Sequence, residues 1–237
     1  MIKNNKIICV GDSTSLPGHN NHYEDTWFYK LKKDFPAFDC ISYFRRSITT
    51  EILVTEGGGI SREFPTGADC LEFYDPGIVI VQLGIVDCAP RLLNKIDKVI
   101  LTFLPSNFKN SYIKLLKKIK KRKATNTEVK LDKFQANLKL FLERCILNEV
   151  EIVVLIAIPF PDERMVKKNP NIILNVELYN KILTGFSETY HFVKVIYPLD
   201  SRNFSENIFE DGYHPNPLGN EIVFQNIKDV IKNYALR

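Results

Sequence analysis

The strongest constraint on the fold comes from two runs in which almost every residue is apolar, at 78–83 and 152–158. Strands covered by helices on both faces have this pattern, because neither face of such a strand meets water. Further strand-like runs lie at about 6–10, 38–43 and 192–196, and helical patterns alternate with the strands at about 24–34, 46–55, 131–148, 173–189 and 216–233. This alternation predicts an α/β fold, a three-layer α/β/α sandwich around a mostly parallel sheet of five strands, with the two apolar runs in its centre.

The length of 237 residues fits one domain that spans the whole chain, 1–237. The stretch at about 91–126 exceeds the roughly two to six residues that usually join a strand to its helix, so we expect a basic helical insertion there. The apolar run at the N-terminus is short and β-branched, which predicts a first strand and not a secretory signal. No apolar stretch approaches the roughly 20 residues that cross a bilayer.

The cysteine and charge content indicate which cellular compartment and which classes of binding partner to expect. The five cysteines are odd in number and widely scattered, and several lie inside apolar runs, which is typical of free thiols in a reducing, cytoplasmic setting. The formal net charge of +4 is modest and does not indicate a nucleic-acid partner. The glycine run at 57–59 lacks the Lys-Ser/Thr ending of a phosphate loop, so nucleotide binding has little support.

The residue types needed for nucleophilic catalysis occur in two short segments at opposite ends of the chain. Ser13 ends a Gly-Asp-Ser turn directly after the first predicted strand, and Asp211 and His214 share the segment Asp-Gly-Tyr-His-Pro-Asn before the last predicted helix. A serine hydroxyl becomes a good nucleophile when an imidazole takes its proton, and a carboxylate fixes the tautomer of that imidazole and stabilises its cation. Each segment alone could simply cap a helix or form a turn, so their joint occurrence carries the hypothesis. We expect Asp12 to be structural and to accept backbone N–H bonds around the turn.

These two segments resemble the first and last sequence blocks of the SGNH (GDSL) hydrolases, and the matches span nearly the whole chain. The resemblance implies a flavodoxin-like fold and a catalytic triad of Ser13, Asp211 and His214. It also implies hydrolysis of acyl esters without a cofactor or a metal.

The third block of that family, usually Gly-x-Asn-Asp, falls at Gly84-Ile85-Val86-Asp87 and departs from the pattern. The asparagine that helps to bind the oxyanion is missing, and Asp87 stands at or beside its place. An ionised carboxylate about 4 Å from an oxyanion would repel it by around 4 kcal/mol at an effective dielectric near 20. Protonation of Asp87, pairing with Arg91 or another nearby cation, or a carboxylate that points away and binds the substrate would avoid this conflict. The structural alternative is a carboxylate that ties down the loop before Pro90.

The second family block, usually a glycine loop, also has no clear match in this sequence. Its best-placed candidate is 45–50, with the glycines at 57–59 as the other. The Ser13 N–H and backbone N–H groups of the first candidate, at Ser47 and Thr49, are the expected oxyanion donors. Glycine is not required at such a position when the backbone dihedrals are ordinary.

The loop that follows the Gly-Asp-Ser turn is polar. His19 and His22, with Asp25 beyond them, could suggest a metal site, but no further histidine or cysteine lies at a ligand-like spacing, so we expect no metal. The loop is better explained as a polar wall over the substrate. Together with Arg45 and Arg91 it favours a polar or anionic substrate.

A basic amphipathic helix is predicted inside the insertion, within 109–123. Ile113, Leu115, Leu116 and Ile119 fall at helical spacings with lysines around them. Such a helix can dock its apolar stripe on its own domain, which is the favoured reading. It can also make a peripheral contact with an anionic membrane or with another protein.

The leading hypothesis is a serine esterase that acts on a short acyl ester, acetyl in the first instance, of a small polar or carbohydrate substrate. One alternative is an O-acyltransferase for the sugars of surface polysaccharides, because Gly-x-x-Asp-Cys-Ala-Pro-Arg resembles a variant in bacterial members of the family from such pathways. Another is a catalytically weak binding protein that keeps the fold. A metal-dependent hydrolase using Asp12, His19 and His22 is a further alternative.

Overall fold

A computed structural model of the chain describes residues 4–55, 67–90, 95–119 and 127–235. Five strands form one sheet in the order β2-β1-β3-β4-β5, and every neighbouring pair is parallel. The strands are β1 (Lys6–Gly11), β2 (Asp39–Phe44), β3 (Ile78–Gln82), β4 (Ile152–Ile156) and β5 (Val193–Ile196). The predicted three-layer sandwich is confirmed, and β3 and β4, the two apolar runs, are interior strands buried along their whole length.

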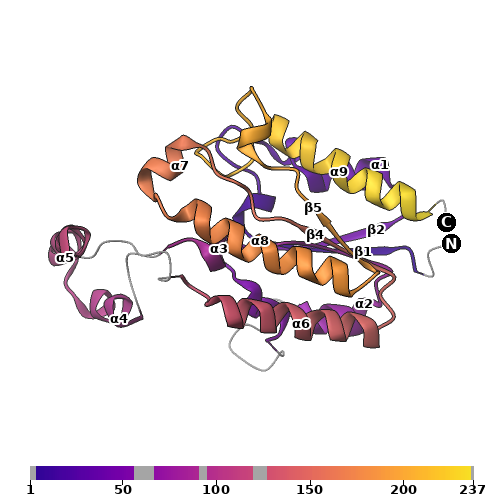
Figure 1. Cartoon of the computed structure of the whole chain (residues 1–237), viewed down its shortest axis with the longest axis horizontal. Coiled ribbons are helices and arrows are strands. Elements are labelled where there is room, and N and C mark those ends of the chain that lie inside the picture. Colours follow the sequence, from indigo (N-terminus) through magenta and orange to yellow (C-terminus); the bar gives the residue numbers. More distant parts are fainter. Residues whose placement is uncertain (1–3, 56–66, 91–94, 120–126, 236–237) are drawn as a thin grey trace.

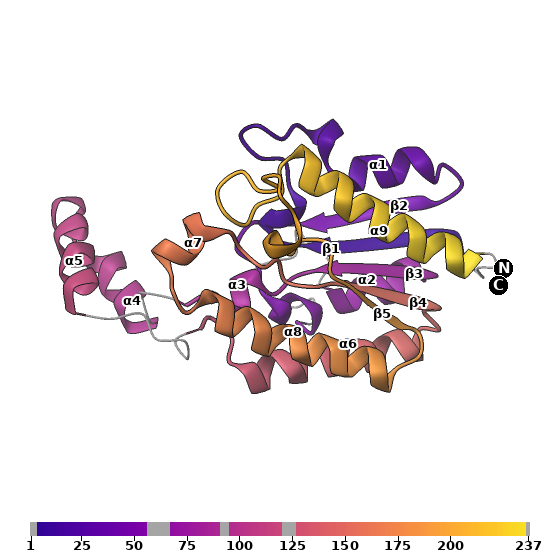
Figure 2. The same cartoon turned by 45° about the horizontal axis from the view of Figure 1, so that its top comes forward.

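Helices cover both faces of the sheet (Figures 1 and 2). One layer contains α1 (Trp27–Asp34) and α9 (Pro217–Ala235), and the other contains α2 (Gly67–Tyr74), α6 (Leu131–Leu147) and α8 (Ile172–Thr189). Successive side chains of a strand point to opposite faces, so each strand supplies both cores. In β1, for example, Ile7 and Cys9 belong to the core beneath α1 and α9, whereas Ile8 and Val10 belong to the core beneath α6 and α8.

The start of α1 lies three residues later than the predicted helix. Residues Tyr23–Asp25 form a separate 3-10 turn, η2, and Thr26 then caps α1 by accepting a hydrogen bond at its side chain from the N–H of Tyr29. Threonine is a preferred residue for this position because its side chain satisfies an N–H group that the first helical turn leaves unpaired.

The helix predicted at 46–55 was wrong. Only Thr50–Leu53 forms a helical turn, the 3-10 segment η3. Ser47 has a φ of 62°, in the left-handed region, which interrupts a right-handed helix. The N–H of Thr50 donates to the carboxylate of Asp87 instead of to a helical carbonyl.

Five further helices of the described residues, α2 among them, were not predicted as such or begin elsewhere than expected. The other four are α3 (Ile85–Cys88), α4 (Lys95–Phe103), α5 (Ser106–Ile119) and α7 (Glu163–Lys168). Helices α4 and α5 belong to the stretch for which we predicted an insertion, and they stand away from the sandwich at the end opposite the two termini (Figures 1 and 2). The glycines at 57–59, Arg91 and the residues from 120 to 126 lie outside the described residues.

All five cysteines are buried and free of disulfides. In the parts of the chain that the structure describes, no helix is both long enough and apolar enough to span a membrane.

The sheet order fixes where chemistry can occur. The chain runs from β1 to β2 at one edge of the sheet and from β3 to β4 toward the other edge. In open α/β sheets, ligands bind where the direction changes in this way, beyond the carboxyl ends of the strands. Ser13 follows β1 and Gly84 follows β3, so both lie at this point. The loop that carries Asp211 and His214 joins β5 to α9 and reaches the same edge.

Candidate active site

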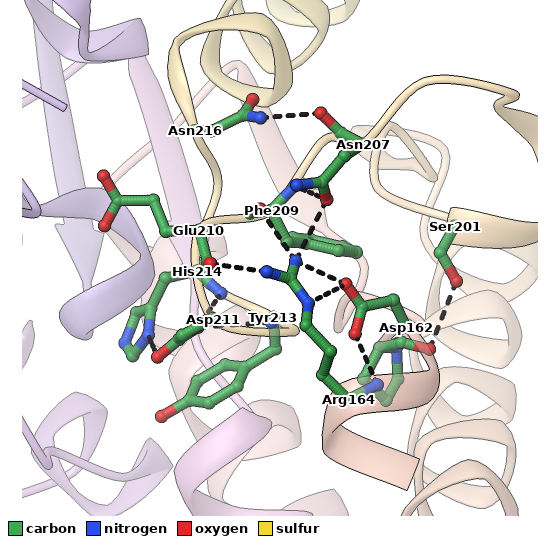
Figure 3. Close-up of polar contacts among 11 residues, drawn as sticks. Asp162, Arg164, Ser201, Asn207, Phe209, Glu210, Asp211, Tyr213, His214 and Asn216 are labelled. Atoms are coloured by element: carbon green, nitrogen blue, oxygen red, sulfur yellow. Dashed lines mark hydrogen bonds and ion pairs between the residues drawn. The ribbon is translucent and has the colours of Figure 1, made fainter. Parts of the chain in front are cut away.

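The structure brings Ser13, His214 and Asp211 together in a hydrogen-bonded chain. The Ser13 Oγ lies 3.0 Å from His214 Nε2, and His214 Nδ1 lies 2.8 Å from Asp211 Oδ2 (the second contact is drawn in Figure 3). Both distances fit hydrogen bonds, and each imidazole nitrogen has one partner. This is the order of contacts that a serine nucleophile, its base and an orienting acid require.

The turn that carries Ser13 is built by its neighbours. Ser13–Ser15 form the 3-10 segment η1, and the Asp12 carboxylate accepts hydrogen bonds from the N–H (2.8 Å) and the hydroxyl (2.7 Å) of Thr14. Asp12 therefore has the structural role expected for it. A side chain at Gly11 would place its Cβ 2.2 Å from Ser15 Oγ, so only glycine allows the turn to fold back on the strand.

Gln82 supports this turn from β3, and the sequence analysis assigned it no role. Its Oε1 accepts hydrogen bonds from Ser15 Oγ (2.6 Å) and from Trp27 Nε1 (2.8 Å), and all three side chains are buried. The available signal was one polar residue within an otherwise apolar strand, because a buried amide is costly unless it is hydrogen-bonded.

The loop 211–214 places the His214 imidazole against the Ser13 hydroxyl. The Asp211 Oδ1 accepts the N–H of His214 (3.1 Å), while its Oδ2 contacts the imidazole, so the carboxylate holds both the backbone and the ring of one residue. The ring of Tyr213 packs on that imidazole with 4.1 Å between centroids. Partial burial opposes ionisation of Asp211, but the hydrogen bonds from His214 outweigh it and lower the pKa of Asp211 below its ordinary value. Asp211 is therefore an anion at neutral pH.

Arg164, on α7, joins this loop to the rest of the molecule (Figure 3). Its guanidinium donates to the backbone carbonyls of Glu210 (2.7 Å) and Phe209 (2.9 Å) and to the side-chain oxygen of Asn207 (3.0 Å). Asp162 accepts from the Nε (2.9 Å) of the same guanidinium and donates its own N–H to the carbonyl of Gly212 (2.9 Å). No pattern in the sequence pointed to this cluster, because its members come from segments some 40 residues apart.

The polar loop after Ser13 contacts the same region. The Glu210 carboxylate accepts the N–H groups of Asn20 (2.9 Å) and His19 (3.3 Å), so this loop is tied to the residue before Asp211. The residues His19 and His22 are both exposed. Among the described residues, no group of three or more His, Cys, Asp or Glu is arranged to hold a metal ion.

The carboxylate of Asp87 is fully buried and holds Thr50. It accepts the N–H (2.9 Å) and the hydroxyl (2.6 Å) of Thr50, and Asn137 donates to that same hydroxyl (3.2 Å). Burial raises the pKa of Asp87 to about 6, against the lowering effect of the two bonds from Thr50. This geometry favours a structural tie between α3 and the segment after β2. A pair with Arg91 would lie outside the described residues.

The other candidate binding residues lie in the segments after β2 and β3. Arg45 is exposed, and its N–H donates to the carbonyl of Gly11 (3.1 Å), which extends the β1–β2 ladder. Ser47 is exposed and Thr49, half-buried, precedes η3. Gly84 has a φ of 123° and packs against β4's continuation at Ile158, where a Cβ would lie 2.6 Å from a side-chain carbon.

Backbone N–H groups close to Ser13 are candidate donors to an oxyanion. In the described part of the chain, the Ser13 N–H has no hydrogen-bond acceptor, so it is available. The N–H of Thr50 is not, because Asp87 occupies it.

Comparisons with known proteins concern the fold of this chain. Neither the protein-family models nor the curated proteins include a match to this sequence. A lipase/acylhydrolase structure from Enterococcus faecalis is similar, with a TM-score of 0.60 and 18% identity over 97% of this chain and 96% of that chain. A member of the lipolytic protein G-D-S-L family from Veillonella parvula gives a TM-score of 0.56 and 16% identity over 96% and 98%. The chain has the fold of the GDSL hydrolases.

A third structure with this GDSL fold is an acetyl-xylooligosaccharide esterase from Geobacillus, with a TM-score of 0.59 and 14% identity over 96% of this chain and 94% of that chain. The coverage shows that the GDSL fold extends over almost the whole of each chain.

Proposed function

We propose that the protein is a serine esterase that hydrolyses a short acyl ester of a small polar or carbohydrate substrate through an acyl-serine intermediate. The contact between Ser13 Oγ and His214 Nε2 at 3.0 Å carries this proposal, because it joins a nucleophile to a base that Asp211 already orients.

In the first half of the reaction, His214 takes the proton of Ser13 as the Oγ attacks the ester carbonyl. Asp211 is an anion and accepts the Nδ1 proton of His214, so it stabilises the imidazolium as that cation forms. The tetrahedral intermediate collapses when His214 returns the proton to the departing alcohol oxygen, and the acyl group stays on Ser13.

In the second half, a water molecule loses a proton to His214 and attacks the acyl-serine, and Ser13 leaves with that proton. The Ser13 N–H is aimed at neither a carbonyl nor a carboxylate of the described residues, so it can donate to the oxyanion in both halves. Each proton that leaves a nucleophile is delivered to a leaving group, so the cycle restores the enzyme.

Three observations support a polar substrate. The loop with His19 and Asn20 is exposed and is tied to Glu210, next to Asp211. Arg45 is exposed at the end of β2, on the same edge of the sheet. Of the similar structures, one is named for an acetylated sugar substrate, xylooligosaccharide. Acetyl esters of sugars are therefore the first substrates to assay.

The test is labelling of the purified protein with a fluorophosphonate, with the modified peptide identified by mass spectrometry. We expect the label on Ser13, with labelling lost in Ser13→Ala and strongly reduced in His214→Ala. Labelling elsewhere, or equal labelling of His214→Ala, would contradict the triad. Adding sugar acceptors to an assay with p-nitrophenyl acetate separates hydrolysis from transfer, because an O-acyltransferase would give acylated sugar at the expense of acetate. No labelling at all would favour the binding-protein alternative.

A further inference from the structure

The basic charge of the chain is concentrated in one segment. Between Lys95 and Lys118, within α4 and α5, there are six lysines and one acidic residue, Asp97. The whole chain has 32 basic and 28 acidic residues, so this segment has a formal net charge of +5 and the remainder −1. Asp97 is buried and accepts a hydrogen bond from the hydroxyl of Tyr112 (3.3 Å), which links α4 to α5. The only acid of the segment therefore lies beneath its surface.

The same two helices expose apolar side chains. Four of them share one face of α4, because they follow one another at intervals of three, one and three residues: Ile96, Val99, Ile100 and Phe103. Phe103 is 83% exposed, and Phe108, at the start of α5, is 61% exposed. Contiguous apolar side chains are rarely left in water on a soluble protein unless they contact a partner.

The position of these helices relates them to the candidate active site. Both stand beyond α3 and α7, at the end of the molecule opposite the two termini (Figures 1 and 2). The carboxyl ends of the strands, and with them Ser13, face this end of the sandwich. A surface bound by α4 and α5 would therefore lie on the side of the molecule from which a substrate approaches.

We propose that α4 and α5 bind the surface of an anionic lipid bilayer. The apolar face of α4, with Phe108, would enter the boundary between headgroups and acyl chains, and the lysines would lie among the anionic headgroups. A nucleic acid would match the charge but would leave Phe103 in water. A second copy of the chain would cover the apolar face but would bring two segments of +5 together. Of these three surfaces, the anionic lipid surface alone matches both features.

The experiment is co-sedimentation of the full chain with phosphatidylcholine vesicles and with vesicles that also contain phosphatidylglycerol. We expect binding to the second kind only, and weaker binding as salt is raised, because salt screens exposed charges. The catalytically inactive Ser13→Ala variant should bind like the native chain. The measurement thus stays independent of the proposed esterase activity.

Two double variants separate the apolar from the charged contribution. Phe103→Ser with Phe108→Ser should weaken binding by about tenfold or more through lost apolar burial. Lys109→Glu with Lys114→Glu should weaken it to a similar degree and remove its dependence on phosphatidylglycerol. The matched controls are Phe73→Ser, at an exposed phenylalanine of α2, and Lys33→Glu with Lys133→Glu, on α1 and α6. These controls should bind like the native chain.

Several results would overturn the proposal. They are a native chain that stays in the supernatant with both kinds of vesicle, equal binding to neutral vesicles, or equal losses in the controls. Gel filtration adds one more: a native dimer that Phe103→Ser with Phe108→Ser converts to a monomer, without any vesicle binding, would assign the face to a second copy.

Discussion

At the residue scale, the contacts of Asp87 predict that its hydrogen-bond acceptance, and not its negative charge, is what the protein needs. Its carboxylate accepts the N–H and the hydroxyl of Thr50 in a fully buried site. In Asp87→Asn the remaining carbonyl oxygen can accept both bonds, so we expect kcat/KM within about tenfold of the native value. In Asp87→Ala both donors of Thr50 lose their acceptor, which we expect to lower the free energy of unfolding by about 2–3 kcal/mol. Urea denaturation and hydrolysis of p-nitrophenyl acetate measure the two effects.

The opposite pattern would give Asp87 a different role. A loss of more than about 100-fold in kcat/KM for Asp87→Asn, with unchanged stability, would mean that the negative charge takes part in the reaction. A large gain would mean that the native carboxylate opposes formation of the oxyanion.

The residues of the proposed triad were easier to predict than the residues that hold them. Asp211 and His214 lie three positions apart, so one turn determines their contact, and Ser13 is marked by the end of a strand. Gln82 and Arg164 act on segments far away in the sequence, and their partners depend on how those segments pack. Local sequence patterns carry no information on such contacts.

At the element scale, the turn after β3 depends on Gly84. It has a φ of 123°, which residues other than glycine rarely adopt. A Cβ at this position would lie 2.6 Å from Ile158 Cδ1. We expect Gly84→Ala to lower the free energy of unfolding by about 2–4 kcal/mol. The matched control is Gly185→Ala in the interior of α8, where no atom lies within 4 Å of the added Cβ. That variant should be about 0.5–1 kcal/mol more stable, because alanine favours a helix interior. Equal effects at the two positions in urea denaturation would refute the argument.

The connection between α7 and the loop 207–214 yields a second prediction at this scale. Arg164 holds three acceptors of that loop through a planar fork that a lysine ammonium cannot reproduce. Arg164→Lys should therefore lower kcat about tenfold with little change in KM, because it loosens the position of His214 and leaves the substrate contacts in place.

Arg202 provides the matched control for Arg164. It makes the same local pair with the aspartate two residues before it, Asp200, and no hydrogen bond from its guanidinium to the loop 207–214 is found among the described residues. Arg202→Lys should leave kcat unchanged. A larger effect on kcat for Arg202→Lys than for Arg164→Lys would show that the loss reflects general destabilisation.

The elements that were predicted correctly are those whose sequence pattern and packing agree. Apart from Gln82, the strands β3 and β4 are apolar, and both are buried along their whole length, so the apolar pattern of the sequence matches their surroundings. The segment 46–55 has the periodicity of a helix. However, the N–H of Thr50 donates to the carboxylate of Asp87, a contact between distant segments that the local pattern does not contain. The position and extent of α4 and α5 could not be predicted, because the two helices stand away from the sandwich and the apolar face of α4 is exposed.

At the scale of the whole molecule, the dependence of stability on pH should reflect the carboxyl group of Asp12. This side chain is fully buried beneath the candidate site, and its Oδ2 has no hydrogen-bond partner within the described structure. Burial raises the pKa of Asp12 to about 7, with the nearby Asp87 acting in the same direction and the bonds from Thr14 opposing it. Between its ordinary pKa of 3.8 and about pH 7, the folded state therefore binds more protons at this group than the unfolded state does.

The contribution of Asp12 to stability is fully present below pH 3.8 and is lost as the pH rises through about 7. In Asp12→Asn the amide oxygen can still accept the bonds from Thr14, and nothing at this position titrates. The free energy of unfolding of Asp12→Asn, minus that of the native protein, should therefore increase by up to about 4 kcal/mol from pH 4 to pH 8. Urea denaturation across this range measures the difference, with Asp229→Asn, at an exposed carboxylate of α9, as control. Parallel curves for Asp12→Asn and the native protein would mean that Asp12 ionises inside the folded molecule without cost, which a buried carboxylate with one unpaired oxygen should not do.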